Sequence, residues 1–194
     1  MKLYMTESSG NAFKPRLLLE MLKVPYEKAM LDTKAKEHKA APYLKVNPRG
    51  QVPALQDDGR VFWDSTACLV YIARKHGGEK WLPTDAAGLA EVMQWLALSN
   101  NELHYGLQWA RGVVNKIKVG DVEEYRGYGN NGLRVLEERL KKHDWLALGR
   151  TTIADLACYP YVKVSPEGGF KLEDYPGVQA WVARVEGLPG WVAR

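Results

Sequence analysis

The sequence predicts an α/β domain in residues 1–77 followed by an all-helical domain in residues 85–194. Short apolar runs of strand length alternate with helical periodicity in the first part, whereas every long segment of the second part has helical periodicity. Between them, the stretch from Gly77-Gly78 to Pro83-Thr84-Asp85 has the composition of an interdomain linker. With 194 residues, of which 46% are hydrophobic, the chain is long and apolar enough to bury a sizeable core.

The first domain is expected to have the element order β-α-β-α-β-β-α. Residues 2–5 and 26–32 are typical of strands, and the helix predicted between them ends before Pro25. Asp58-Gly59 interrupts an apolar run and predicts a hairpin with a tight turn. A periodic apolar segment after Ser65 predicts the closing helix. This is the order of a thioredoxin-like domain, in which ligands gather at the loops beyond the strand ends.

The dipeptide Val52-Pro53, at the start of the hairpin, is a candidate peptide-binding element. Proline has no N–H for a strand ladder, and a cis bond before Pro53 is one way to place it there. The N–H and C=O of Val52 would then face outward and pair with an extended peptide, as an added strand does. The alternative is that Pro53 only begins a strand.

The pair Asp64-Ser65 is expected to give this site its selectivity. Ser65 stands where an N-cap belongs, and the free N–H groups of a helix start attract a carboxylate. Asp64 beside it would hold an ammonium group. A ligand with both groups on one carbon and a peptide behind them is an α-amino acid head on an extended chain. The γ-glutamyl end of glutathione is such a group.

The string Asn47-Pro48-x-Gly50-x-Val52-Pro53-x-Leu55, together with Asp64-Ser65, resembles the glutathione-binding half of cytosolic-type, bacterial glutathione S-transferases. The resemblance extends over nearly the whole chain. It implies glutathione as co-substrate, a small electrophile as second substrate, and a homodimer that acts in detoxification in the cytoplasm. It also implies that a basic residue of this loop, His38 or Lys39 and otherwise Lys36, contacts the glycine carboxylate; a solvated charged loop is an equally good explanation for each of them. Asp64 departs from the longer Glu or Gln that the family often has.

Polar residues before the first helix are candidates to stabilise the thiolate of bound glutathione. A thiol with a pKa of ~8.5 is mostly protonated at neutral pH, so the site must favour the charged sulfur. Ser9 is the first candidate, and Asn11 and Ser8 follow, each as a hydrogen-bond donor close to the helix start. For Asn11, capping the helix is an equally good explanation. Tyr4 or Thr6 is the next residue to test if none of these acts.

The second domain offers a candidate pocket for the electrophile. On the long helix predicted around residues 92–109, one stripe is apolar and a second face is mixed. The mixed face carries Glu102, Tyr105 and Trp109, which could line a pocket for an apolar substrate or could simply pack in the core. Residues 116–132 are polar and contain glycines, which predicts a less regular connection.

Thr152 and Asp155 have the spacing of a capping box in front of an apolar run. This motif predicts a structural role at the start of a helix. The string Thr152-Ile153-Ala154-Asp155 is similar to the buried cap of a core helix in the second domain of the same transferases.

Composition narrows the class of partner. The net charge of +4 is spread along the chain without a Lys/Arg block, which argues against nucleic acid as a partner. No apolar segment has the length of a membrane span, so we expect a cytoplasmic protein with no membrane contact. The two cysteines, Cys68 and Cys158, lack metal-ligand spacing and are expected to be reduced and structural, with no bound metal.

The sequence therefore predicts a glutathione transferase whose chemistry resides in the thiol of the bound peptide. Peroxide or disulfide reduction with the same thiol is the nearest variant. A non-catalytic glutathione-binding or regulatory protein with the same fold is the alternative of a different class.

Overall fold

The computed structural model describes all residues, 1–194, and the chain divides into two compact units. The first unit is Met1–Leu82 together with Pro189–Arg194, and the second unit is Pro83–Leu188. The sequence instead placed the last six residues with the second domain. They return to the first unit because Gly190, at a φ of 79°, lets the chain pass within van der Waals contact of Met21.

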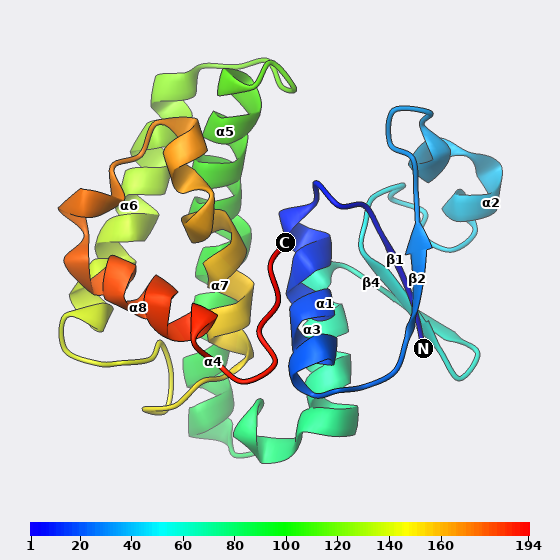
Figure 1. Ribbon diagram of the computed structural model, residues 1–194, viewed down its shortest axis with the longest axis horizontal. Coiled ribbons are helices and arrows are strands. Elements are labelled where there is room, and N and C mark those ends of the chain that lie inside the picture. The colour runs from blue at the N-terminus through cyan, green and yellow to red at the C-terminus, as the bar shows by residue number, and fades with distance from the viewer. The chain divides into compact units, whose positions relative to one another are not determined.

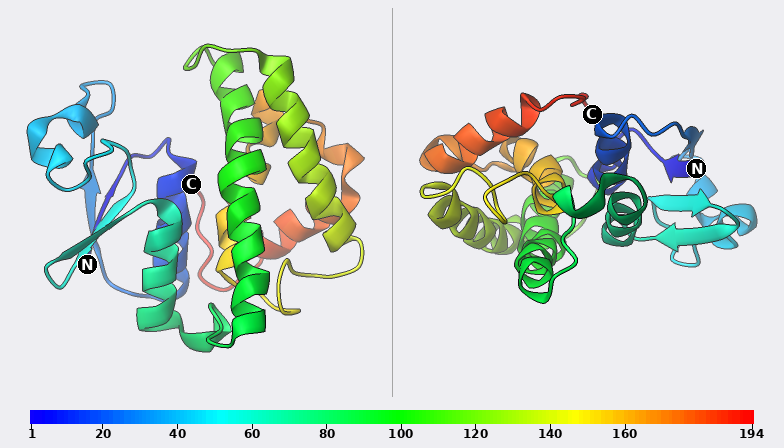
Figure 2. Two further views of the ribbon diagram at one scale, coloured as in Figure 1. Left: turned by 180° about the vertical axis from the view of Figure 1, so that it is seen from behind. Right: turned by 90° about the horizontal axis from the view of Figure 1, so that it is seen from below.

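The first unit is a four-stranded sheet with two helices on one face (Figures 1 and 2). The strand order is β2-β1-β3-β4; β1 and β2 are parallel and the other pairs antiparallel. The prediction of a thioredoxin-like domain is confirmed. Its strands and helices are β1 (Lys2–Met5), α1 (Gly10–Met21), β2 (Glu27–Met30), α2 (Ala41–Leu44), β3 (Ala54–Asp57), β4 (Arg60–Trp63) and α3 (Ser65–Ile72).

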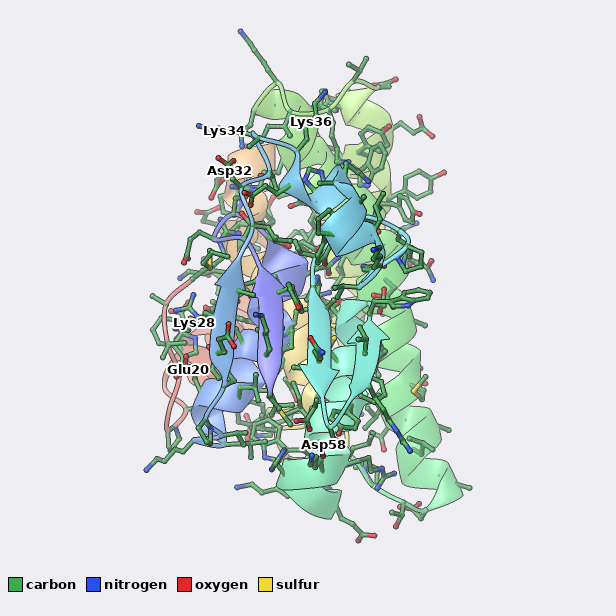
Figure 3. The ribbon with its side chains drawn as sticks, turned by 90° about the vertical axis from the view of Figure 1, so that its right-hand side faces the viewer. Glu20, Lys28, Asp32, Lys34, Lys36 and Asp58 are labelled. Atoms are coloured by element: carbon green, nitrogen blue, oxygen red, sulfur yellow. The ribbon has the colours of Figure 1, made fainter.

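Alternation along the strands explains which face the helices cover. Leu3, Met5 and Leu55 are buried and point toward α1 and α3, whose own Leu17, Leu18 and Leu69 are also buried. The opposite face is polar at Lys2 and Gln56 and faces the viewer in Figure 3.

The turns that follow β3 and β2 are formed by residues that favour turns. Asp58 and Gly59 both have positive φ, 47° and 73°, as a two-residue hairpin turn requires, and Figure 3 shows Asp58 at the tip of the hairpin. β2 is shorter than the predicted 26–32, because Asp32 accepts hydrogen bonds from the N–H groups of the next turn, at Lys34 and Ala35.

The second unit is all-helical, as predicted. One long rod is formed by α4 (Ala86–Leu98), a π-helical stretch η4 (Ser99–Gln108) and α5 (Trp109–Val114), and α6 (Val122–Leu140) lies beside it (Figure 2). α7 (Ile153–Lys163) and α8 (Pro176–Glu186) complete the unit. The short remaining helical segments of the chain are η1 (Glu37–Lys39), η2 (Ala73–Gly77), η3 (Gly78–Lys80), η5 (Ser165–Gly168) and η6 (Leu172–Asp174).

The prediction of a less regular connection over residues 116–132 is wrong beyond residue 121, because α6 begins at Val122. Asp121 caps α6 by accepting from the N–H groups of Glu123 and Glu124, at 2.9 and 3.4 Å. The glycines in α6 are not helix breakers here. A Cβ on Gly106 of η4 would meet the backbone of Gly129, so the glycines let the two helices approach closely.

The capping box at the start of α7 is confirmed and extends into a larger network. The N–H of Thr152 donates to Asp155 at 2.9 Å, and the hydroxyl oxygen of Thr152 accepts from the N–H of Ala154 at 3.2 Å. The Asp155 carboxylate also accepts from the Trp181 indole N–H at 3.0 Å and from the N–H of Leu146 at 3.2 Å. Asp155 thereby joins α7, α8 and the loop before α7.

Replacing Asp155 with Ala should lower the stability of the second unit by about 2 kcal/mol or more, because buried N–H donors lose their acceptor. Burial raises the pKa of Asp155 to about 6, above its ordinary 3.8. The folded state therefore binds the proton more tightly, and this contribution is fully present below pH 3.8 and is lost as the pH rises through about 6. The difference in the free energy of unfolding between the parent and Asp155→Ala should therefore increase by about 1 kcal/mol when the pH falls from 7 to 5.

Denaturant unfolding of both proteins at the two pH values measures this difference. Asp155→Asn is the control, because it keeps an acceptor oxygen but has no titrating carboxyl. Equal unfolding midpoints for parent and Asp155→Ala would contradict the structural role of the network.

Candidate functional site

The loop before β3 presents an unpaired stretch of backbone. The Val52-Pro53 peptide bond is cis, which is one of the two possibilities that the sequence left open, and the N–H and C=O of Val52 have no hydrogen-bonding partner within the protein. The neighbouring Gln51 carbonyl is held by two donors, the Tyr43 hydroxyl and the Asn47 amide, each at 2.7 Å. Burial raises the pKa of Tyr43 to about 12, so this donor stays protonated at neutral pH. The loop is therefore fixed while Val52 remains available to a ligand.

Gly50 explains why this loop can be so compact. It has a φ of 56°, in the left-handed region that favours glycine. A Cβ at this position would lie 2.8 Å from the carbonyl oxygen of His38. The glycine of the motif thus allows the loop to pack against the η1 segment.

The start of α3 differs from the prediction in one respect: Asp64, and not Ser65, is the N-cap. The Asp64 carboxylate accepts from the N–H of Thr66 at 2.8 Å, and Ser65 is the first residue of the helix. Both residue types are good caps, and here the carboxylate reaches the second N–H of the helix. The N–H groups of Ser65 and Ala67 have no partner within the protein. Free N–H groups at a helix start are suited to an anion, so the start of α3 is a candidate site for a carboxylate.

The second carboxylate oxygen of Asp64 has a cationic neighbour. A guanidinium nitrogen of Arg49 lies 3.6 Å from it, and the same group lies 5.8 Å from the centroid of the Trp63 ring. The pair is half-exposed, so its net contribution to stability is small. A ligand ammonium would have to replace Arg49 at Asp64. Sequence reasoning did not find Arg49, because no local pattern reveals an ion pair across a turn.

The start of α1 contains two of the three thiolate candidates, and one of them, Asn11, contacts the start of α3. Ser9 is the N-cap of α1 and accepts from the N–H of Ala12 at 3.1 Å, which leaves its hydroxyl hydrogen without an acceptor. Asn11 lies in the first turn of α1, so it does not cap the helix; its amide oxygen accepts from the Ser65 hydroxyl at 3.2 Å. Ser8 is exposed and has no hydrogen bond within the protein.

The basic candidates lie in η1. The Lys39 ammonium donates to the Arg49 carbonyl at 3.3 Å, which ties it to the Val52 loop. His38 has a buried ring nitrogen, Nδ1, without a partner. Of the two reserve candidates, Tyr4 donates its hydroxyl to Gln56 at 3.1 Å, and Thr6 accepts from the N–H of Ser9 through its carbonyl at 3.2 Å.

The electrophile-pocket candidates of the second unit are only partly brought together. Glu102 and Tyr105 border a hollow of about 410 Å³. Trp109 is not among its lining residues, and its ring centroid lies 5.9 Å from that of Tyr105. The other lining residues are Asn101, Glu124, Tyr125 and Tyr128. Sequence reasoning missed those on α6, since it did not expect a helix there. The spacing of Tyr125 and Tyr128, one helical turn apart, was the available signal.

Residues 1–74 match the glutathione S-transferase N-terminal domain, and residues 115–189 match the glutathione S-transferase C-terminal domain. The chain belongs to the glutathione S-transferase family. It is 33% identical over 192 residues to the probable glutathione S-transferase GSTF2 of Oryza sativa subsp. japonica, covering 93% of this chain and 89% of that protein. It is also 28% identical over 195 residues to the disulfide-bond oxidoreductase YfcG of Escherichia coli, covering 92% and 87%.

Solved structures of this family agree with the fold. A possible glutathione S-transferase from Rhodopseudomonas palustris superposes with a TM-score of 0.91 at 33% identity, over 99% of this chain and 96% of that one. Ure2p in complex with glutathione superposes with a TM-score of 0.85 at 26% identity, over 97% and 95%. No helix of the chain combines the length and the apolar composition needed to cross a membrane.

Proposed function

We propose that this member of the glutathione S-transferase family is a glutathione transferase that binds the tripeptide in its first unit. One observation carries the proposal: the unpaired N–H groups at the start of α3 lie beside an acidic cap, in a unit that also leaves Val52 unpaired. An anion-binding helix end with a carboxylate next to it matches the α-amino acid head of a γ-glutamyl group.

Each part of the tripeptide has a candidate partner. The γ-glutamyl carboxylate accepts from the N–H of Ser65 and from its hydroxyl, which turns from Asn11 to the ligand, and the ammonium replaces Arg49 at Asp64. The N–H and C=O of Val52, before Pro53, pair with the peptide backbone as an added strand would. His38 and Lys39 are the candidates for the glycine carboxylate.

The reaction depends on a thiolate. A serine hydroxyl is too weak a base to take the thiol proton, so Ser9 acts as a donor that favours the charged sulfur, helped by the positive end of α1. Asn11 and then Ser8 are the other candidates. The sulfur lone pair forms a bond to the electrophilic carbon, and the leaving group departs with the electron pair of its own bond. Glu102, Tyr105 and Trp109 remain the candidates for holding the electrophile.

Disulfide reduction is the second candidate function. It is favoured by the likeness to a disulfide-bond oxidoreductase at 28% identity. Both cysteines of the chain, Cys68 and Cys158, are buried, and burial raises the pKa of the Cys68 thiol. A reductase activity would therefore also use the thiol of bound glutathione. A non-catalytic glutathione-binding protein is the remaining alternative. Turnover of a generic aryl halide separates it from the transferase, and glutathione-dependent reduction of a disulfide separates it from the reductase.

Ser65→Ala should weaken glutathione binding by roughly 1 to 3 kcal/mol, because a carboxylate loses a hydroxyl donor. Asp64→Asn should also weaken it, because the negative charge that faces the ammonium is lost. Asparagine caps a helix as well as aspartate does, so the start of α3 should be preserved. Calorimetric titration measures both changes. Asp174→Asn, at an exposed carboxylate of the second unit, is the control. Unchanged affinity in both site variants would refute the assigned groove.

Ser9→Ala should raise the pKa of the bound thiol toward its free value of ~8.5 and lower turnover, with glutathione affinity nearly intact. The head group is held elsewhere, which is why affinity should persist. Thiolate absorbance against pH measures the shift, with Asn11→Ala and Ser8→Ala compared in the same way. Ser9→Thr keeps both the hydroxyl and the cap, so it should behave like the parent. If no variant moves the thiol pKa, the activating donor is another residue.

The resemblance also implies a cytoplasmic homodimer, and we retain that as part of the proposal. Light scattering at micromolar concentration should give twice the mass of the 21.9 kDa chain. A monomer mass would reject the dimer without affecting the glutathione site.

A further inference from the structure

The hollow between η4 and α6 is lined mainly by aromatic and acidic side chains. Its volume of about 410 Å³ is that of a small-molecule site. Three tyrosines, two glutamates and one asparagine line it: Tyr105, Tyr125, Tyr128, Glu102, Glu124 and Asn101. No lysine, arginine or histidine is among the lining residues.

The two glutamates carry charge that the protein does not neutralise. Neither Glu102 nor Glu124 forms an ion pair or a side-chain hydrogen bond within the protein. Other glutamates of the unit do have partners: Glu123 pairs with Arg126, and Glu91 lies 3.2 Å from Arg139. The hollow is therefore a local negative site in a chain whose net charge is +4.

Trp109, which contacts two of the lining tyrosines, already holds an ammonium group. The Lys118 ammonium lies 3.6 Å from the centroid of the Trp109 ring, at the distance of a cation–π contact. Trp109 lies 5.9 Å from Tyr105 and 5.4 Å from Tyr125, between ring centroids. The rings that border the hollow thus continue a cluster that the chain itself uses to bind a cation.

We propose that this hollow binds a small organic cation, an ammonium group attached to an apolar body. Tyrosine rings attract a cation through their quadrupole, and the two carboxylates add charge complementarity without the strict geometry of a metal site. Because the hollow includes Glu102 and Tyr105, the inference deepens the proposed function: the second substrate is amine-bearing or cationic. Anionic electrophiles are disfavoured.

The test uses three aromatic probes of similar size, one cationic, one neutral and one anionic: benzyltrimethylammonium, benzyl alcohol and benzoate. Titration of the full-length protein, followed by NMR, should give a dissociation constant for the cation at least about five-fold lower than for the neutral probe. Benzoate should bind most weakly. Equal affinity for the three probes would overturn the proposal.

Variants locate the binding. Glu102→Gln and Glu124→Gln keep the size of the side chain and remove its charge, and each should weaken the cation probe about five-fold while leaving benzyl alcohol unchanged. Glu138→Gln, at an exposed glutamate on the same helix as Glu124, is the matched control and should change neither. Tyr125→Leu should weaken the cation more than the alcohol, since it removes a ring but keeps an apolar side chain.

The outcomes separate this inference from the proposed function. If glutathione binds but the cation probe does not, or binds equally to all glutamate variants, only the inference fails. If the cation binds as expected and glutathione does not, the proposed function fails and the hollow remains a cation site. A hollow filled by a basic side chain of a second copy would show no probe binding in a dimer, and this also overturns the inference.

Discussion

The carboxylate of Asp64 is the constraint on which the candidate site depends. One of its oxygens caps α3 through Thr66, and the other faces Arg49. The residue has a φ of 80°, so the chain turns sharply from β4 into the helix. This turn places the N–H of Ser65 at the N-terminal end of α3, where it has no partner within the protein. It also places the Ser65 hydroxyl 3.2 Å from the amide oxygen of Asn11 in α1. The two helix starts are thereby joined at the end of the sheet where β1 and β4 finish and β3, which follows the unpaired Val52, begins.

The packing of the second unit depends on a different constraint, which is the absence of a side chain at two glycines. Gly106 and Gly129 let η4 and α6 approach so closely that a Cβ on either would meet the neighbouring helix or its packing partners. Asp155 then fixes α7 and α8 by hydrogen bonds in the core. Both devices are structural, and the glycines set the spacing of η4 and α6, between which the tyrosine-lined hollow lies.

Local chemistry made part of this structure predictable. The hairpin at Asp58-Gly59, the cis bond before Pro53 and the capping box at Thr152 each depend on residues close in sequence, and all three are present. The N-cap of α3 was misplaced by one residue, because Asp64 and Ser65 are both good caps and only the observed backbone decides between them.

Long-range packing was not predictable in the same way. In the sequence, the glycines of α6 indicated an irregular segment. In the structure they are needed for close packing against η4. Arg49 beside Asp64, and the α6 side of the hollow, also depend on tertiary contacts that periodicity does not reveal. The return of Pro189–Arg194 to the first unit belongs with these features, since nothing in its own composition indicates it.

The central claim is that Asp64 faces the ammonium of a γ-glutamyl group while the start of α3 holds its carboxylate. The most direct measurement compares glutathione with its analogue that lacks the γ-glutamyl amino group, each titrated calorimetrically into the parent and into Asp64→Asn. The account predicts that removal of the amino group weakens binding to the parent and has little further effect in Asp64→Asn, since the two changes remove the same interaction. An equal loss in both proteins would show that the ammonium lies elsewhere and would contradict the account.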